Sequence, residues 1–278
     1  MLLTATTDIR VSCAQDTPVV AMLRPRSGQA QWVLAQRYEL APWVPAREYV
    51  DSYGNLCQRF VVPRGEARIR VASDVEVDGT VAVDVHAPRA PVERLPDDAL
   101  VYMLQSRYCP SDVMEDQAKE VVKGCAPGYP QAARIEAWIR EKLDYRYGVS
   151  DASTTALDTL GHGAGVCRDF AHVGISLCRA LHLPARFVVG YLYRLDPMDM
   201  HAWYEVYLGD RWYTFDATQD RPRGGRIVVA YGRDATDVAF LSSYEPLEIT
   251  KMQVAVEKVE AGSAVADAPV AAATPAAA

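Results

Sequence analysis

The chain has 278 residues, of which 50% are hydrophobic and 23% charged, and its formal net charge is -7 at pH 7. This length suits one large domain or two smaller ones, and we favour two. The acidic balance, without any stripe rich in lysine and arginine, argues against nucleic acid or a membrane surface as a partner.

The N-terminal residues lack the basic start and long apolar stretch of a secretory signal. No run approaches the ~20 apolar residues that a membrane-spanning helix requires, so we expect a cytoplasmic protein. The six cysteines lie far apart and outside close-paired motifs, which favours reduced thiols over a disulfide framework or a structural zinc site. They are Cys13, Cys57, Cys109, Cys125, Cys167 and Cys178.

Residues 1–95 read as short β-rich runs separated by turn signals, with no long helical period between them. Residues 68–77 alternate polar and apolar side chains as a half-buried strand does, and residues 52–55 are typical of a hairpin turn. The pattern predicts an N-terminal antiparallel β-sandwich domain. The expected strands are residues 9–14, 19–23, 32–40, 59–62, 68–77 and 81–86.

Residues 87–96 contain three prolines and suit a connector between domains. The second domain is expected over residues 96–258, with packing helices that begin at Ser111 and Pro130. Strands are expected at residues 185–193, 201–208, 211–216 and 227–230. Residues 259–278 are rich in alanine and proline and have no large apolar group to bury, so we expect a disordered tail there.

Residues 163–172 set one cysteine at the point where a glycine-rich loop becomes an amphipathic helix. The first backbone N–H groups of a helix have no internal partner and carry the positive end of its dipole, so they would stabilise a thiolate at Cys167. Helical phase turns the Cys167 sulfur towards the domain interior. The small residues Ala171 and Gly174 on the same side would let a strand approach closely.

A hairpin register brings a histidine and an aspartate together downstream. Gly209 and Asp210 can form a two-residue turn with glycine in the first central position, so position 208 faces 211 and position 203 faces 216. Side chains alternate along strands, so His201 and Asp216 share one face as diagonal neighbours, with Cβ atoms roughly 7 Å apart. A register slip of one residue would separate them.

Cysteine catalysis needs a base within reach of the thiol and a carboxylate that fixes the imidazole tautomer. Taken alone, His201 and Asp216 are more readily read as ordinary residues at strand ends. Together with Cys167 at the start of a helix, they predict a Cys-His-Asp triad.

Other polar residues are less suited to catalysis. His162, Cys167 and His172 match no common zinc spacing and lack a fourth ligand nearby. His172 lies about 140° around the helix from Cys167, which favours a packing role. Glu205 is a reserve carboxylate only. The remaining residues are read as helix-border or solvated acids and a packing thiol: Asp144, Asp158, Asp169 and Cys178.

The predicted hairpin is rich in aromatic residues, and core packing is favoured over the lining of a substrate cleft. These residues are Trp203, Tyr204, Tyr207, Trp212, Tyr213 and Phe215.

Residues 154–218 resemble the transglutaminase-like superfamily in its bacterial branch, through the segments around Cys167, residues 185–191, His201 and Asp216. Weaker similarity extends to residues 232–239 and to residues 51–60. The resemblance implies a papain-like α+β core behind a β-rich domain, with Cys167 as nucleophile, His201 as base and acid, and Asp216 as the orienting residue. It also implies acyl transfer from an amide through a thioester, without a metal or other cofactor.

The leading hypothesis is a cysteine peptidase, isopeptidase or amidase, or a transglutaminase, that acts on a protein or peptide. The Cys167 backbone N–H would be one oxyanion donor, and Tyr145 or Tyr147 is a candidate for the second. A non-catalytic protein-binding scaffold and a small-molecule acyltransferase remain as alternatives. The sequence gives no oligomeric state.

Overall fold

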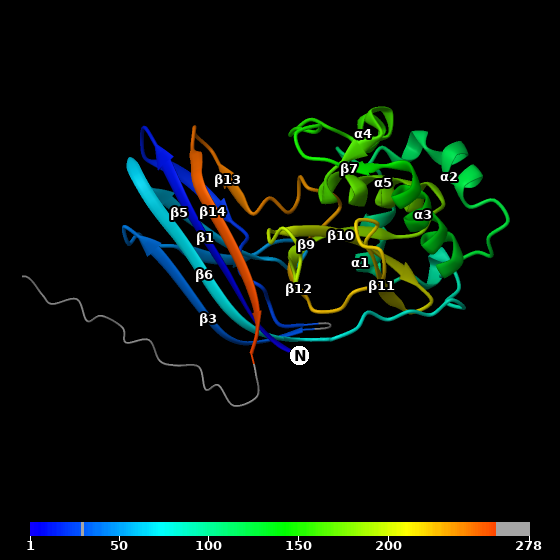
Figure 1. Cartoon of the computed structure of the whole chain (residues 1–278), viewed down its shortest axis with the longest axis horizontal. Helices are drawn as coiled ribbons and strands as arrows, with labels where there is room; N and C mark the ends of the chain where they lie inside the picture. Colours follow the sequence, from blue (N-terminus) through cyan, green and yellow to red (C-terminus); the bar gives the residue numbers. More distant parts are fainter. Residues whose placement is uncertain (29–30, 260–278) are drawn as a thin grey trace, which may run out of the picture.

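The computed structural model describes residues 1–28 and 31–259. A β-sandwich lies beside a region in which helices cover a sheet (Figure 1). The fold is α+β, as the sequence predicts. Beyond Val259, the expected disordered tail lies outside the described residues. No helix in the described ranges is long and apolar enough to cross a membrane.

Two four-stranded antiparallel sheets form the sandwich, with strand orders β14-β1-β6-β3 and β13-β2-β5-β4. The alternation predicted for residues 68–77 turns Ile69 and Val71 of β6 inward, where they pack with Ile9 of β1 and Phe60 of β5. The strands are β1 (Leu2–Cys13), β2 (Thr17–Ala21), β3 (Gln31–Ala41), β4 (Arg47–Val50), β5 (Leu56–Val62), β6 (Gly65–Val77), β13 (Leu241–Ser243) and β14 (Glu248–Lys258).

Two sequence expectations about the sandwich are corrected. Strands β13 and β14 pair with β2 and β1, so the second domain does not run unbroken to residue 258 (Figure 1). Their partners lie more than 200 residues away in the chain, and pairing at that distance leaves no local sequence signal. Residues 81–86 form no strand, because β6 already pairs with β1 on one side and β3 on the other.

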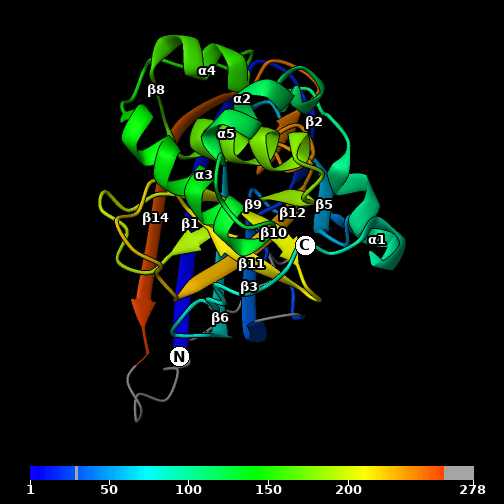
Figure 2. The same cartoon turned by 90° about the vertical axis from the view of Figure 1, so that its right-hand side faces the viewer.

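The second region is an antiparallel sheet of order β11-β10-β9-β12 with helices on one face (Figures 1 and 2). Its strands are β9 (Ala185–Leu192), β10 (His201–Leu208), β11 (Arg211–Phe215) and β12 (Arg226–Gly232). The helices are α1 (Asp97–Leu100), α2 (Glu115–Val121), α3 (Tyr129–Lys142), α4 (Ala156–His162) and α5 (Cys167–Ala180), with 3₁₀ turns at Val92–Arg94, Val101–Met103 and Ser111–Val113. The helix expected from Ser111 therefore begins as a 3₁₀ turn.

Helix α5 lies close against β10, as its small residues predict. A Cβ built on Gly174 would come within 2.5 Å of the Tyr204 ring, so only glycine allows this separation. Tyr204, Val206, Tyr213 and Phe215 face the helices and join the main apolar core. The opposite face of this sheet therefore carries the other half of each strand's side chains, including His201.

Side-chain amides join the sandwich to the edge strand β12. The Gln31 amide donates to Val228 O at 2.8 Å and accepts from Val228 N–H at 2.7 Å. Asn55, from the hairpin turn between β4 and β5, makes the same pair of bonds with Tyr231. These amides satisfy backbone groups that an edge strand would otherwise leave unpaired. They also fix the sandwich relative to the sheet that carries His201.

Candidate active site

The loop before α5 is fixed by a short parallel ladder between β7 (Asp144–Tyr145) and β8 (Ala164–Gly165). Gly163 ends α4 with a φ of +64°, a left-handed conformation that favours glycine. Asp169 accepts a hydrogen bond from Val166 N–H at 2.9 Å and so caps the start of α5. These contacts place Cys167 as the first residue of α5, as the sequence predicts.

Cys167 is half-buried and lines a cavity of about 260 Å³ together with His201. The ladder also brings Tyr145 to this cavity, beside the start of α5. Tyr147 follows β7, and Val166 directly precedes α5. The other lining residues come from the loop before His201 and the loop after Asp216: Leu195, Asp196, Pro197, Asp199, Met200, Thr218 and Gln219.

The hairpin register is confirmed. Tyr204 pairs with Phe215 and Leu208 with Arg211, around a turn in which Gly209 has a φ of +62°. This register leaves His201 and Asp216 on one face, and the distance from His201 Nε2 to Asp216 Oδ2 is 2.7 Å. The carboxylate therefore holds one ring nitrogen and leaves Nδ1 for the thiol.

His201 is only 2% exposed, and its pKa is raised to about 9. Burial by itself lowers this pKa, but the charge and hydrogen bond of Asp216 and the neighbouring Cys167 thiol outweigh it. The imidazole is thus held in its charged form at neutral pH. An imidazolium beside the thiol is the arrangement that stabilises a thiolate.

Asp216 is also buried, and four donors hold its carboxylate. Oδ2 accepts from His201 Nε2 and from Arg226 Nη2, the latter at 2.8 Å. Oδ1 accepts from the Thr218 hydroxyl at 2.6 Å and from Thr218 N–H at 3.2 Å. Burial raises the pKa of Asp216, but His201, Arg226 and the Thr218 hydroxyl hold it well below the ordinary value. The carboxylate stays ionised.

Arg226 and Thr218 are parts of this site that the sequence reasoning missed. Thr218 lies two residues after Asp216, where a hydroxyl that bonds back to a carboxylate is a common local pattern. Arg226 is the first residue of β12, a strand that the sequence analysis expects to begin one residue later, at Ile227. A buried arginine at a strand start has no spacing signal that would connect it to an aspartate ten residues earlier.

The other candidate residues lie apart from Cys167. His172 is fully buried in α5, stacked on Tyr108, and its Nε2 accepts a hydrogen bond from Ala235 N–H. His162 is exposed at the end of α4. Cys178 is fully buried. Within residues 1–28 and 31–259, no group of three histidine, cysteine or acidic side chains is placed to hold a metal ion.

Three acids have structural partners. Asp169, expected to be solvated or a helix-start acid, is fully buried at the helix start and pairs with Arg168 at 2.8 Å. Asp158 accepts from Thr155 N–H and so caps α4. Glu205, the reserve carboxylate, is paired with Arg186 at 2.6 Å and is not in contact with His201.

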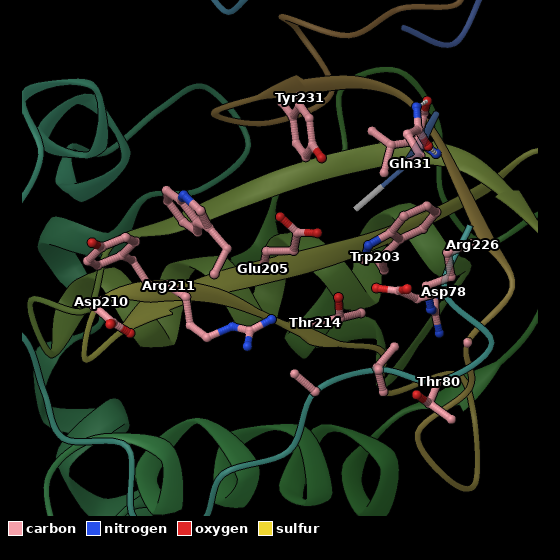
Figure 3. A pocket seen from close by; sticks show the side chains of 16 residues that line it. Gln31, Asp78, Thr80, Trp203, Glu205, Asp210, Arg211, Thr214, Arg226 and Tyr231 are labelled. Carbon is pink, nitrogen blue, oxygen red and sulfur yellow. Dashed lines mark hydrogen bonds between the residues drawn. The ribbon is translucent and has the colours of Figure 1, made fainter. Parts of the chain in front are cut away.

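A larger cavity of about 700 Å³ lies over the outer face of the sheet (Figure 3). Trp203, Tyr207 and Trp212 line it, whereas Tyr204, Tyr213 and Phe215 pack in the core. The predicted aromatic hairpin thus divides its side chains between packing and a cavity wall. Arg226 lies at one end of this cavity beside Trp203.

Comparison with known families gives two matches that follow one another in the chain. The transglutaminase-like superfamily matches residues 115–217, which include α5, β10 and β11. The bacterial transglutaminase-like N-terminal region matches residues 12–78, which fall in the sandwich.

Proteins similar over most of the chain are also known. A candidate cysteine protease from Cytophaga hutchinsonii has a crystal structure that matches with a TM-score of 0.88 and 30% identity, over 94% of this chain and 91% of that one. An uncharacterised protein of Mycobacterium leprae is 29% identical over 253 residues, which is 85% of this chain and 90% of that protein. A Mycobacterium tuberculosis protein, also uncharacterised, is 29% identical over 268 residues, 85% of each chain.

Proposed function

This chain belongs to the transglutaminase-like superfamily, and we propose that it is a cysteine-dependent enzyme that transfers or hydrolyses an acyl group at an amide. The observation that carries the proposal is the placement of Cys167 and His201 in one cavity, with Asp216 bonded to the far nitrogen of His201 at 2.7 Å. A protein or peptide is the proposed substrate class.

The proposed reaction has two halves. The Cys167 thiolate attacks the amide carbonyl, a carbon–sulfur bond forms, and the imidazolium of His201 gives its proton to the departing amine. Water or an amine then attacks the thioester, with neutral His201 as the base, and the thiolate is released. Asp216 keeps the imidazole in one tautomer throughout, and its ionised state supports this role.

Tyr145 is the proposed second oxyanion donor beside the Cys167 backbone N–H. Burial raises the pKa of Tyr145, and the adjacent Cys167 thiol and Tyr147 hydroxyl raise it further, so the phenol keeps its proton and can donate. The rings of Tyr145 and Tyr147 meet edge to face with centroids 5.6 Å apart.

We expect Tyr145→Phe to lower the acylation rate of Cys167 by about a hundredfold, because one oxyanion donor is lost. The matched variant Tyr147→Phe removes the hydroxyl of the neighbouring, more exposed tyrosine and should retain most of the rate. Stopped-flow measurement of acylation by an activated ester compares the two. Equal acylation rates in the two variants would contradict the assignment of Tyr145 as the second oxyanion donor.

The thioester itself tests the proposed function. The protein is incubated with a panel of peptide amides and quenched in acid, and intact and peptide mass spectrometry locate any adduct. We expect an acyl adduct on Cys167 that hydroxylamine releases, and none in Cys167→Ala or His201→Ala. Cys178→Ala, at a buried thiol outside the cavity, is the matched control and should form the adduct.

The alternatives give different outcomes in the same experiment. Adducts from small acyl thioesters but from no peptide amide would indicate a small-molecule acyltransferase. An absence of adducts from every donor, together with unchanged binding of a protein partner by Cys167→Ala, would indicate a scaffold and contradict the proposal.

A further inference from the structure

We propose that Arg226 is a positioning residue for the catalytic pair, which anchors one oxygen of Asp216 and compensates the charge that this carboxylate carries in the buried site. The inference rests on the proposed function, because it concerns the same site. It begins from the shared oxygen: Asp216 Oδ2 lies 2.7 Å from His201 Nε2 and 2.8 Å from Arg226 Nη2. The guanidinium therefore fixes the atom that orients the histidine.

Arg226 is itself held in place. Its Nε donates to Arg223 O at 2.9 Å, and its guanidinium lies over the Trp203 ring at 4.9 Å. The side chain is only 7% exposed, at the end of the large cavity (Figure 3). Because the Arg226 side chain has so little freedom, its guanidinium restrains the Asp216 carboxylate to which it is bonded.

One donor of Arg226 remains unpaired. Its Nη1 is buried and has no hydrogen-bond partner among the described residues. The other two guanidinium nitrogens are engaged, Nε by the Arg223 carbonyl and Nη2 by Asp216 Oδ2, so the charge of Arg226 is directed at the carboxylate.

Arg223 extends the same arrangement to the rim of the catalytic cavity. Its Nη1 donates to Gln219 Oε1 at 2.6 Å, and its Nη2 donates to the carbonyls of Tyr193 and Arg194. Gln219 lines the cavity, and Arg226 bonds the backbone of Arg223. Arg226 is thus connected to both the catalytic carboxylate and the loops that border the thiol.

Several charged and titratable groups surround the catalytic pair. Glu136 of α3 accepts from Asp216 N–H at 2.7 Å and lies 3.8 Å from Arg140. Arg226 contacts the Asp216 carboxylate directly, beside the His201 ring. The titratable and charged groups around the pair are Glu136, Arg140, Tyr145, Tyr147, Cys167, Asp196, Asp199, Tyr204 and Arg226.

The charge of Arg226 sets how readily His201 gives up its proton. When His201 deprotonates, the Asp216 carboxylate remains in a buried site, and Arg226 then supplies the compensating charge. Without that cation the pair retains its proton to higher pH. A purely structural arginine would affect stability but would leave the titration of His201 unchanged.

NMR titration of the histidine ring signals in the full-length protein tests this. The chain has five histidines, and His201→Asn assigns the signal of interest. We expect the His201 midpoint to move up by about one pH unit in Arg226→Gln and in Arg226→Met, and to return towards the wild-type value in Arg226→Lys. Met keeps an apolar chain over Trp203 but carries no charge.

Two internal references separate the outcomes. Arg211→Gln removes an exposed arginine that lines the large cavity away from Asp216 and should leave the midpoint unchanged. The signal of buried His172 reports whether each variant is folded. An unchanged His201 midpoint in folded Arg226→Gln or Arg226→Met would overturn the proposal, as would loss of the His172 signal in both. Thioester formation on Cys167 is scored separately, so failure of the proposed function remains distinguishable.

Discussion

The start of β10 and the middle of α5 each bury a histidine, and the two sites favour opposite protonation states. Burial lowers the pKa of both rings. At His172 burial prevails and the pKa falls to about 3, whereas at His201 the Asp216 carboxylate and the Cys167 thiol raise the pKa to about 9. Burial alone therefore does not identify a catalytic histidine.

The difference comes from how the nearby acid is used. Asp216 bonds a ring nitrogen of His201 directly. Near His172, the Asp234 carboxylate instead accepts backbone N–H groups of Tyr108 and Thr236. These backbone donors stabilise the Asp234 charge, and the attraction of that charge for the ring raises the His172 pKa by less than burial lowers it. His172 remains a neutral packing residue.

We expect the largest effect in the acylation activity of variants at the two histidines. His201→Ala should lower the rate of Cys167 acylation by about a hundredfold to ten-thousandfold, because the proton-transfer group is lost. His172→Phe should retain activity but lose about 1–3 kcal/mol of unfolding free energy, because the Ala235 N–H loses its acceptor. Acylation rates and urea unfolding measure both. Comparable activity losses in the two variants would abolish the distinction.

The pH dependence of stability should have opposite signs at the two sites. His172 has a folded pKa of about 3 against a reference of 6.5, so its contribution is lost as pH falls below 6.5, when the unfolded chain takes up the proton. His201 has a folded pKa of about 9, so its contribution is complete below pH 6.5 and is lost as pH rises towards 9.

This is tested by measuring the unfolding free energies of wild type, His172→Phe and His201→Ala between about pH 4 and about pH 9, a range in which both histidine pKa shifts affect stability. The difference between wild type and His172→Phe should change only on the acid side, and that for His201→Ala only on the alkaline side. Each slope should reach about 1.4 kcal/mol per pH unit. Slopes of the same sign would show that the surroundings of the two rings are not opposed.

The smallest expected effect concerns two side-chain hydroxyls, one at each site. Thr218→Val removes a 2.6 Å bond to Asp216 Oδ1 and should lower the acylation rate about fivefold, the equivalent of about 1 kcal/mol. Ser176→Ala removes a bond to the His172 carbonyl within α5 and should leave the rate unchanged. If both variants match wild type, the Thr218 hydroxyl makes no contribution to the catalytic carboxylate.

Local rules were sufficient to predict much of the site. The Gly209–Asp210 turn sets the strand register, and that register alone puts His201 and Asp216 on one face. The helix start at Cys167 follows from the glycine-rich loop before it. In each case the determining residues lie within a few positions of the element that they shape.

Contacts between distant segments could not be predicted in this way. Strand β14 pairs with β1 across almost the whole chain, and its mostly exposed side chains give a weak strand pattern. Arg226 reaches Asp216 because the start of β12 pairs with the end of β9, at the same end of the sheet as His201 at the start of β10. The burial of Asp169 likewise depends on tertiary packing around the start of α5.

The most direct test of the central claim is the alkylation rate of Cys167 by iodoacetamide at neutral pH, measured by peptide mass spectrometry beside that of Cys125. Both thiols are half-buried, but only Cys167 shares a cavity with His201. We predict that Cys167 reacts at least about tenfold faster than Cys125 and that His201→Ala removes the difference. Equal rates in wild type, or a Cys167 rate unaffected by His201→Ala, would contradict it.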